Sequence, residues 1–206
     1  FVAIVGPSGC GKTTLLNLLS GHDKPTSGEV ERHGVVRQVY QQDGLFPWMT
    51  VSQNIALGVA ESERATAVSE MLALIRMESF GEHFPHQLSG GMRQRVELAR
   101  ALAGQSDILL MDEPFSALDY ISRLRIRNEV AHLIRERPRT VVLVTHDIEE
   151  AAQLADRVLV LSERPARIVK ELVIKLPRPR ELTHPEVVGA IHDTLMQLGL
   201  ESAIAN

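Results

Sequence analysis

Short apolar runs alternate with amphipathic stretches along this chain, and the alternation predicts its elements. The clearest apolar runs cover residues 1–5, 108–111 and 140–144. Uninterrupted apolar runs of this length are typical of strands buried on both faces of a parallel sheet. Weaker strand patterns cover 35–40, 158–161 and 167–175. Helical spacing of apolar residues between the runs, as at 92–103 and 120–137, predicts an α/β protein with a mostly parallel sheet and helices on its faces.

Shorter signals place the remaining helices. Thr50 or Ser52 is expected to cap a short helix that follows it. Thr183 and Glu186 have the spacing of a capping box, which predicts a helix from there to about residue 198. Residues 62–77 carry an apolar stripe at helical spacing, which we interpret as core packing. The stripe comprises Ala65, Val68, Met71, Leu72 and Ile75.

A glycine-rich stretch after the first apolar run has the spacing of a phosphate-binding loop. Its glycines permit a tight turn that points backbone N–H groups at an anion, and the following helix adds the positive end of its dipole. Lys12 supplies a charge for the β- and γ-phosphates, and the hydroxyl of Thr13 suits Mg²⁺. The loop therefore predicts binding of a nucleoside triphosphate without fixing the reaction. It comprises Gly6, Pro7, Ser8, Gly9, Cys10, Gly11, Lys12 and Thr13.

Two carboxylates end the second apolar run. Because ligands of open α/β sheets bind at the carboxyl edge of the strands, Asp112 and Glu113 are expected beside the phosphate-binding loop. Asp112 suits a Mg²⁺ contact, and Glu113 suits a general base acting on an attacking water. His146 ends the third run at the same edge, where it can donate to the γ-phosphate. Gln41, in the loop after 35–40, is a further candidate to reach Mg²⁺ or the water.

A second anion-binding helix start is expected at residues 88–92, which read Leu-Ser-Gly-Gly-Met. Ser89, Gly90 and Gly91 offer a hydroxyl and free backbone N–H groups at a helix N-terminus, by the same physics as the first loop. One chain with two such sites requires an explanation.

The length, net charge and cysteine content of the chain exclude several classes of protein. The 206 residues suit one domain or one domain with a subdomain, and the net charge of -4 argues against a large basic surface for nucleic acid. The single cysteine, Cys10, excludes an internal disulfide. No apolar run reaches the roughly 20 residues that span a bilayer, so a membrane link is expected through another subunit. Because the chain begins with Phe1 inside a predicted strand, we expect a fragment whose N-terminal strands are missing.

With these motifs in order, the chain resembles the ATP-binding subunits of ABC transporters. Residues 6–13 look like the Walker A motif and 108–114 like Walker B. Gln41 looks like the Q-loop glutamine and His146 like the H-loop histidine. Two further segments match the family, 88–95 as its signature and 116–119 as its D-loop.

The resemblance implies a RecA-like P-loop NTPase fold and a division of the chain. The nucleotide-binding α/β core would comprise 1–45 and 105–176, the helical subdomain with the signature 46–104, and a C-terminal helical tail 177–206. It also implies ATP and Mg²⁺ as cofactors. Thr13, Gln41 and Asp112 would hold the metal, whereas the catalytic residues would be Lys12, Gln41, Glu113 and His146.

The family also explains the two anion sites, since its members pack head to tail with ATP between the P-loop of one copy and the signature of the other. Ser89 and Gly91 would act on the nucleotide of a second copy, and Asp119 would link the two subunits. Thr14 would lie near a phosphate. Family members carry an aromatic residue ahead of Walker A that stacks on adenine, a region that lies outside this sequence.

A narrower resemblance concerns the transported solute. Segments 45–48, 84–87 and 176–180 look like those of bacterial nitrate, sulfonate and taurine importers, although relatives that import thiamine-pyrimidine precursors look similar. The Pro-Arg repeat in 176–180 is equally well explained as a solvated linker. The group implies uptake of a small anion through transmembrane permease subunits and a periplasmic or lipid-anchored solute-binding protein, with this chain peripheral on the cytoplasmic face of the bacterial inner membrane.

Two alternatives remain open beside the importer. A non-transport ABC ATPase acting on DNA or ribosomes usually carries long coiled-coil or zinc insertions or two cassettes, whereas this chain has one cassette and an acidic balance. A nucleotide-binding module without catalysis is disfavoured because Glu113 and His146 are both present.

Overall fold

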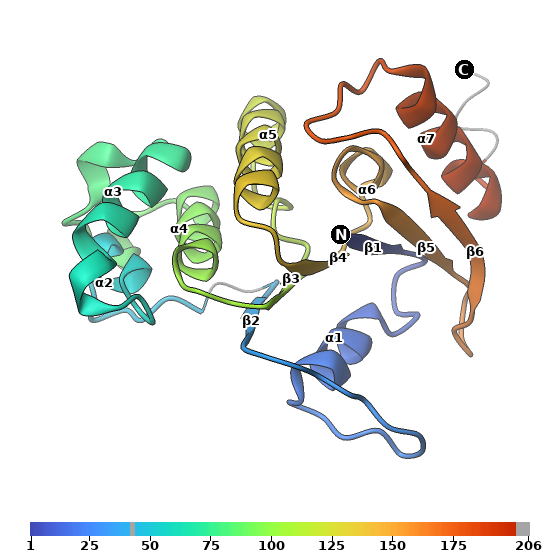
Figure 1. The fold of residues 1–206 in the computed structure, drawn as a ribbon, viewed down its shortest axis with the longest axis horizontal. Coiled ribbons are helices and arrows are strands. Elements are labelled where there is room, and N and C mark those ends of the chain that lie inside the picture. The colour runs from blue at the N-terminus through green and yellow to red at the C-terminus, as the bar shows by residue number, and fades with distance from the viewer. Residues whose placement is uncertain (42–43, 201–206) are drawn as a thin grey trace.

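A mixed β-sheet forms the centre of the computed structural model, which describes residues 1–41 and 44–200. Within those ranges the sheet has six strands in the order β2-β3-β4-β1-β5-β6 (Figure 1). The strands are β1 Val2–Val5, β2 Val36–Val39, β3 Ile108–Asp112, β4 Thr140–Val144, β5 Arg157–Leu161 and β6 Ile168–Val173. Each predicted apolar run is therefore a strand, as expected of an α/β protein.

The sheet is parallel except at one edge. Between the described strands, the pairs β2–β3, β3–β4, β4–β1 and β1–β5 are parallel, whereas β5 and β6 are antiparallel. The six residues that join β5 to β6 are too few for a crossover, so they can only form a hairpin. The carboxyl ends of β1 to β5 consequently lie along one edge, where a ligand of this fold class binds.

Helices cover both faces of the sheet (Figure 1). Helix α1 packs on one face, while α4 and α6 pack on the other, and α2 and α3 pack against α4 beside the sheet. The helices are α1 Lys12–Ser20, α2 Val51–Ile55, α3 Arg64–Leu74, α4 Gly90–Ala103, α5 Tyr120–Glu136, α6 Ile148–Leu154 and α7 Pro185–Gln197. Short 3-10 turns lie at η1 Glu61–Glu63, η2 Glu78–Phe80 and η3 Pro85–Gln87. The domain boundaries predicted at 45, 104 and 176 stay predictions.

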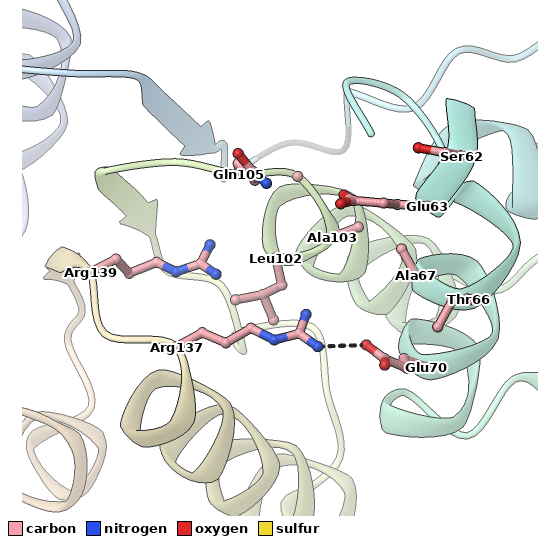
Figure 2. A pocket seen from close by; sticks show the side chains of 11 residues that line it. Ser62, Glu63, Thr66, Ala67, Glu70, Leu102, Ala103, Gln105, Arg137 and Arg139 are labelled. Carbon is pink, nitrogen blue, oxygen red and sulfur yellow. Dashed lines mark hydrogen bonds and ion pairs between the residues drawn. The ribbon is translucent and has the colours of Figure 1, made fainter. Parts of the chain in front are cut away.

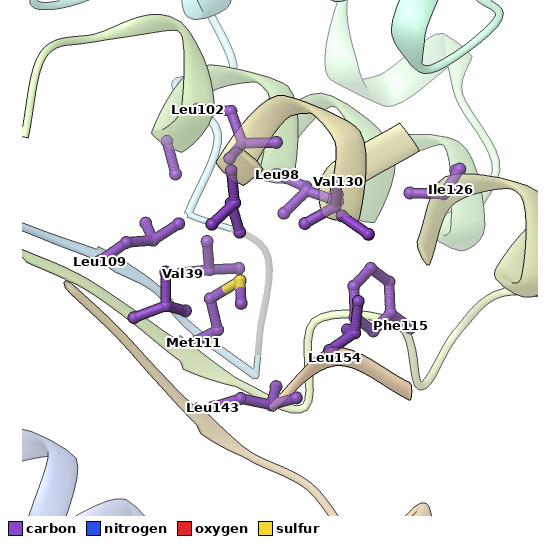
Figure 3. Packing of buried hydrophobic residues seen from close by; sticks show 14 of the residues in the cluster. Val39, Leu98, Leu102, Leu109, Met111, Phe115, Ile126, Val130, Leu143 and Leu154 are labelled. Atoms are coloured by element: carbon purple, nitrogen blue, oxygen red, sulfur yellow. The ribbon is translucent and has the colours of Figure 1, made fainter. Parts of the chain in front are cut away.

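The alternation of side chains along each strand divides the core between the two faces. In β3, Leu110 packs with Leu16 of α1, whereas Met111 belongs to the cluster on the opposite face. Figure 3 shows that second cluster, in which Leu98 of α4 and Val130 of α5 meet the sheet. Burial on both faces explains why β3 reads as a continuous apolar run.

Two predicted helix starts need correction. The stretch 62–77 is not one helix: η1 precedes α3, which ends at Leu74, and Arg76 has a positive φ of 55° that stops any continuation. Helix α7 is capped by His184 and not by Thr183. Pro185 is the reason, because its fixed φ and missing N–H suit the first helical position, which makes the preceding residue the cap. Thr50 does cap α2, with a full capping box.

The Pro-Arg repeat is part of the packed structure, so the interpretation as a solvated linker is wrong. Arg180 is only 2% exposed, and its guanidinium donates to the carbonyl oxygens of Leu176 at 2.6 Å and Ala152 at 3.2 Å. Arg178 donates to the carbonyl of Leu154 at 3.0 Å. The bonds to Ala152 and Leu154 satisfy carbonyls near the end of α6, where a cation is also favoured by the helix dipole. The repeat therefore fixes the C-terminal segment to α6.

A pocket of about 410 Å³ separates α3 from the end of α5 (Figure 2). Glu70 of α3 lies across it from Arg137, with the Nη2 and Oε2 atoms 2.9 Å apart. Both side chains are about half exposed, and an ion pair of this kind contributes only about 0–1 kcal/mol. This ion pair therefore contributes little to holding α3 against the end of α5.

Candidate nucleotide-binding site

The phosphate-binding loop joins β1 to α1 in a conformation that only glycine adopts easily. Gly11, the residue before α1, has φ 111°, a left-handed value that disfavours any other side chain. A Cβ at Gly6 would lie 3.0 Å from the Cβ of Leu161, so the end of β5 packs directly on the loop. The predicted order of strand, loop and helix is confirmed.

Lys12 lies in the first turn of α1 and folds back over the loop. Its Nζ donates to the carbonyl oxygens of Gly6 at 2.8 Å and Pro7 at 2.9 Å, and the residue is 8% exposed. The described contacts use two of the three donors of the ammonium. The charge is thus held at the mouth of the loop, where a phosphate oxygen can accept from it.

A pocket of about 300 Å³ opens over this loop at the carboxyl edge of the sheet. It brings together residues from five segments that are far apart in the sequence. The described residues that line it are Ser8, Gly9, Gly11, Lys12, Thr13, Thr14, Gln41, Asp112, Glu113, Val144 and Arg164. Most residues predicted from Walker A, Walker B and the Q-loop therefore face one cavity.

Cys10 is a predicted loop residue whose side chain does not face this pocket. It is 5% exposed and packs with Ile4 and Leu16 in the core under α1. Its backbone N–H donates to the carbonyl of Pro7 at 3.3 Å, inside the loop itself. Cys10 thus stabilises the loop by packing its side chain into the core, on the side away from the pocket.

Asp112 and Thr13 form the part of the pocket that fits Mg²⁺. Burial raises the pKa of Asp112, which is 3% exposed, while a hydrogen bond from the Thr13 hydroxyl and the charge of Lys12 oppose that rise. Within residues 1–41 and 44–200, no three His, Cys, Asp or Glu side chains form a metal cage. A hydroxyl and one carboxylate nonetheless suit an ion that completes its shell with phosphate oxygens and water. Gln41 lies on the same pocket.

Glu113 lies between two other predicted site residues, Gln41 and His146. Its Oε1 lies 3.1 Å from Nδ1 of His146, and its Oε2 accepts from Nε2 of Gln41 at 3.3 Å. Its backbone has a positive φ of 48°, rare for a residue with a side chain, and its N–H donates to the carbonyl of Val144 at 2.9 Å. Residues that follow β2, β3 and β4 therefore converge on one carboxylate, at the sheet edge where Glu113 and His146 were expected. The predicted roles of Glu113, His146 and Gln41 stay predictions.

The turn that carries His146 is fixed by its neighbours. Asp147 caps α6 and pairs with Arg123 at 3.0 Å, while Arg123 also donates to the carbonyl of Leu118 at 3.2 Å. Burial raises the pKa of Glu150 to about 7, although the Thr145 hydroxyl donates to it. Arg123 thereby connects the histidine turn to the D-loop.

The second predicted anion site lies apart from this pocket. Ser89 caps α4, and its Oγ accepts from the N–H of Met92 at 3.3 Å. Asp119 caps α5, where a hydrogen bond from the Ser122 side chain helps to hold its pKa below the usual range. In the described part of the chain, neither these residues nor Gly90 and Gly91 line the pocket over the P-loop. Their predicted action on a second copy stays a prediction.

Two residues of the pocket were not predicted from the sequence. Val144 ends β4, and Arg164 lies in the hairpin between β5 and β6. The turn after β5 is expected at the carboxyl edge of the sheet, which is a partial signal for Arg164. Only the strand order of the structure shows that β5 lies next to β1 and that this turn therefore lies beside the P-loop.

Comparisons with known proteins agree with this geometry. The family described as "ABC transporter" matches residues 1–116. The chain is 42% identical over 195 residues to the aliphatic sulfonates import ATP-binding protein SsuB of Bacillus licheniformis, covering 90% of this chain and 76% of that protein. It is 41% identical over 197 residues to the nitrate import ATP-binding protein NrtC of Synechococcus elongatus, covering 88% of this chain and 30% of that protein.

A solved structure also matches, with a TM-score of 0.73 and 34% identity over 85% of this chain and 86% of the other. It is a dimeric, post-hydrolysis state of the ATP-binding cassette MJ0796 bound to ADP and Pi. Fold and pocket together define an ATP-hydrolysing P-loop protein. This chain belongs to the ABC transporter family and is an ATPase subunit of that family. No helix among the residues described is both long and apolar enough to cross a membrane.

Proposed function

We propose that this chain hydrolyses ATP to energise uptake of a small anion, of the alkanesulfonate or nitrate class, through partner membrane subunits. The observation that carries the proposal is the position of Glu113 between Gln41 and His146, beside the phosphate-binding loop. The anion class is supported by the relatives, which are named for import of aliphatic sulfonates and of nitrate. Import of a thiamine-pyrimidine precursor is the second candidate.

Hydrolysis follows from the chemistry of the pocket residues and of His146, which contacts Glu113 at the edge of the pocket. Lys12 and the loop N–H groups bind the β- and γ-phosphates, and Thr14 lies at the same pocket. Thr13 and Asp112, with Gln41, would hold Mg²⁺, which supplies positive charge to the phosphate oxygens. Glu113 accepts the proton of the attacking water, and His146 donates to the transferred phosphate.

A surface for the membrane partner lies beside the Q-loop. Trp48 is 68% exposed, and its ring centroid lies 5.3 Å from that of Phe46, which is 39% exposed. A groove of about 470 Å³, lined in part by Tyr40, Leu57 and Arg100, adjoins Phe46. Aromatic and arginine side chains are enriched at protein interfaces, which supports this face as the permease contact. The chain would then be peripheral on the cytoplasmic side of the bacterial inner membrane.

Uptake by the reconstituted system tests the proposal. Together with a permease and a solute-binding protein of the sulfonate or nitrate class, the wild-type chain should support ATP-dependent uptake of a labelled alkanesulfonate or of nitrate in membrane vesicles. Glu113→Gln should abolish that uptake. Transport of only a thiamine-pyrimidine precursor would favour the second candidate. Retention of the chain on DNA, without association with a permease, would refute import.

The two separate anion sites support a head-to-tail dimer, in which Ser89, Gly90, Gly91 and Asp119 of one copy face the nucleotide of the other. A dimeric relative bound to ADP and Pi is consistent with it. Closure of such a dimer on ATP, and reopening after hydrolysis, would move the membrane subunits. The weak contact between Glu70 and Arg137 is compatible with movement of α3 during closure.

Mixed dimers test this arrangement. Lys12→Ala and Ser89→Arg chains are each expected to be inactive alone, but a mixed dimer contains one site with an intact P-loop and an intact signature. Mixing should therefore restore part of the ATP turnover, measured as phosphate release. A mixture of Lys12→Ala with Glu113→Gln is the control, because both changes lie in the P-loop half and leave no intact site. Mixed Lys12→Ala and Ser89→Arg dimers that form but stay inactive would contradict the shared site.

A further inference from the structure

Gln94 is a buried amide that contacts the backbone around Glu113. It lies in α4, one turn after the helix start, and is 6% exposed. Its Nε2 donates to the carbonyl oxygen of Glu113 at 3.1 Å and to Oγ of Ser116 at 3.2 Å. Its Oε1 accepts from the N–H of Ala117 at 2.8 Å. One side chain thus bonds both ends of the turn that follows β3.

That turn holds Glu113 in an unusual conformation. Its φ of 48° is left-handed, a region that side chains disfavour, so other contacts must hold it there. The Glu113 carbonyl accepts from Gln94 and also from Oγ of Ser116 at 3.0 Å. Phe115, buried completely among the core side chains in Figure 3, anchors the middle of the turn. Gln94 and the Ser116 hydroxyl, which Gln94 also bonds, form the polar part of this support, and Phe115 forms the apolar part.

The same helix touches the turn a second time, at its first residues. A Cβ on Gly91 would lie 2.9 Å from the carbonyl oxygen of Ala117, so the start of α4 packs closely on the turn. Gly91 and Gln94 are three residues apart and therefore lie on the same face of α4. The helix that begins at Ser89 and the turn that bears Glu113 form one packed unit.

We propose that Gln94 is a positioning residue for hydrolysis. By fixing the carbonyl of Glu113 it aims the carboxylate at the Nε2 of Gln41 and the Nδ1 of His146. Loss of the amide frees the turn to leave the left-handed conformation, which turns the carboxylate away from the water it must deprotonate. The inference deepens the proposed role of Glu113 and rests on it. Helix α4 begins with the signature residues, which would face a second copy. Through Gln94 the same helix also contacts the turn that bears Glu113, the proposed general base of its own site.

The kinetic constants of Gln94→Leu, measured on the full chain, test this role. We expect kcat for ATP to fall about tenfold to hundredfold with KM nearly unchanged, as is typical when a residue supporting a catalytic group is removed. Gln153→Leu is the matched control. Gln153 is also a buried amide, 3% exposed, and donates to Oδ1 of Asn128 and the carbonyl of Arg180, both at 3.1 Å. Both variants should lower Tm, but Gln153→Leu should keep the wild-type kcat.

A double variant separates positioning from a general structural role. If Gln94 acts through Glu113, adding Gln94→Leu to Glu113→Gln should leave the residual turnover of Glu113→Gln unchanged. A further loss of tenfold or more in that background would overturn the proposal, as would a wild-type kcat in Gln94→Leu or an equal loss in Gln153→Leu. The turnover of Glu113→Gln alone tests a different claim. If this variant kept the wild-type kcat, Glu113 would not be the general base, whatever the result for Gln94.

Discussion

Glu113→Gln should lose ATP turnover by about 10²–10⁴-fold, the usual contribution of a positioned general base, while still binding ATP. An amide has nearly the same shape as the carboxylate and still accepts from Nε2 of Gln41, so the pocket should keep its form. It cannot accept the proton of the attacking water, so the chain stops after binding nucleotide. An ATP-bound dimer should then accumulate.

Phosphate release and size-exclusion chromatography in the presence of ATP and Mg²⁺ measure the two effects separately. Glu163→Gln is the control, because it removes the same charge from an exposed residue beside Arg164 and should leave turnover unchanged. Near-normal hydrolysis by Glu113→Gln would show that another group takes the proton, and the assignment of Glu113 would then be wrong.

Features that depend on neighbouring residues were predictable from the sequence. The apolar run before Asp112 predicts a buried strand from its own residues, and this places the two carboxylates at its end. The P-loop spacing likewise fixes a turn followed by a helix, since Gly11 and Lys12 act through their own backbone and the next turn. Strand ends that share an edge then bring His146 toward Glu113.

Features that depend on contacts between distant segments were not predictable. Gln94 reads as one polar position of an amphipathic helix, and only the packing of α4 on the turn after β3 reveals its bonds to Glu113 and Ala117. Arg180 reads as a surface charge beside prolines, but the carbonyls at the end of α6 surround it. In both cases most of the partners are backbone carbonyl or N–H groups, which leave no pattern of residue types in the sequence.

The local correction at α7 has a different cause. Thr183 and Glu186 match a capping box, but the pattern ignores Pro185 between them, which makes His184 the cap. The N–H of Glu186 donates to Nδ1 of His184 at 3.3 Å, so the imidazole replaces the expected hydroxyl. Two local preferences apply here, a hydroxyl side chain at the cap and proline at the first helical position. The fixed backbone of Pro185 has the larger effect.

Lys12→Ala should weaken ATP binding itself by about tenfold to hundredfold. A hydrogen bond to a charged group contributes about 1.5–3 kcal/mol, and each 1.4 kcal/mol changes an equilibrium constant tenfold. The substitution also removes the donor that bonds the carbonyls of Gly6 and Pro7, so the loop loses part of its own support. Both effects act before chemistry, in contrast to the loss expected for Glu113→Gln.

Calorimetric titration with ATP, in the presence of Mg²⁺, measures this change. Lys24→Ala is the matched control, because Lys24 is an exposed lysine beyond the end of α1 and its removal subtracts the same charge from the chain. Its Kd for ATP should equal that of the wild type. If Lys12→Ala instead kept the wild-type Kd and lost only turnover, Lys12 would act on the transition state alone, and its assignment as a ligand of bound ATP would be wrong.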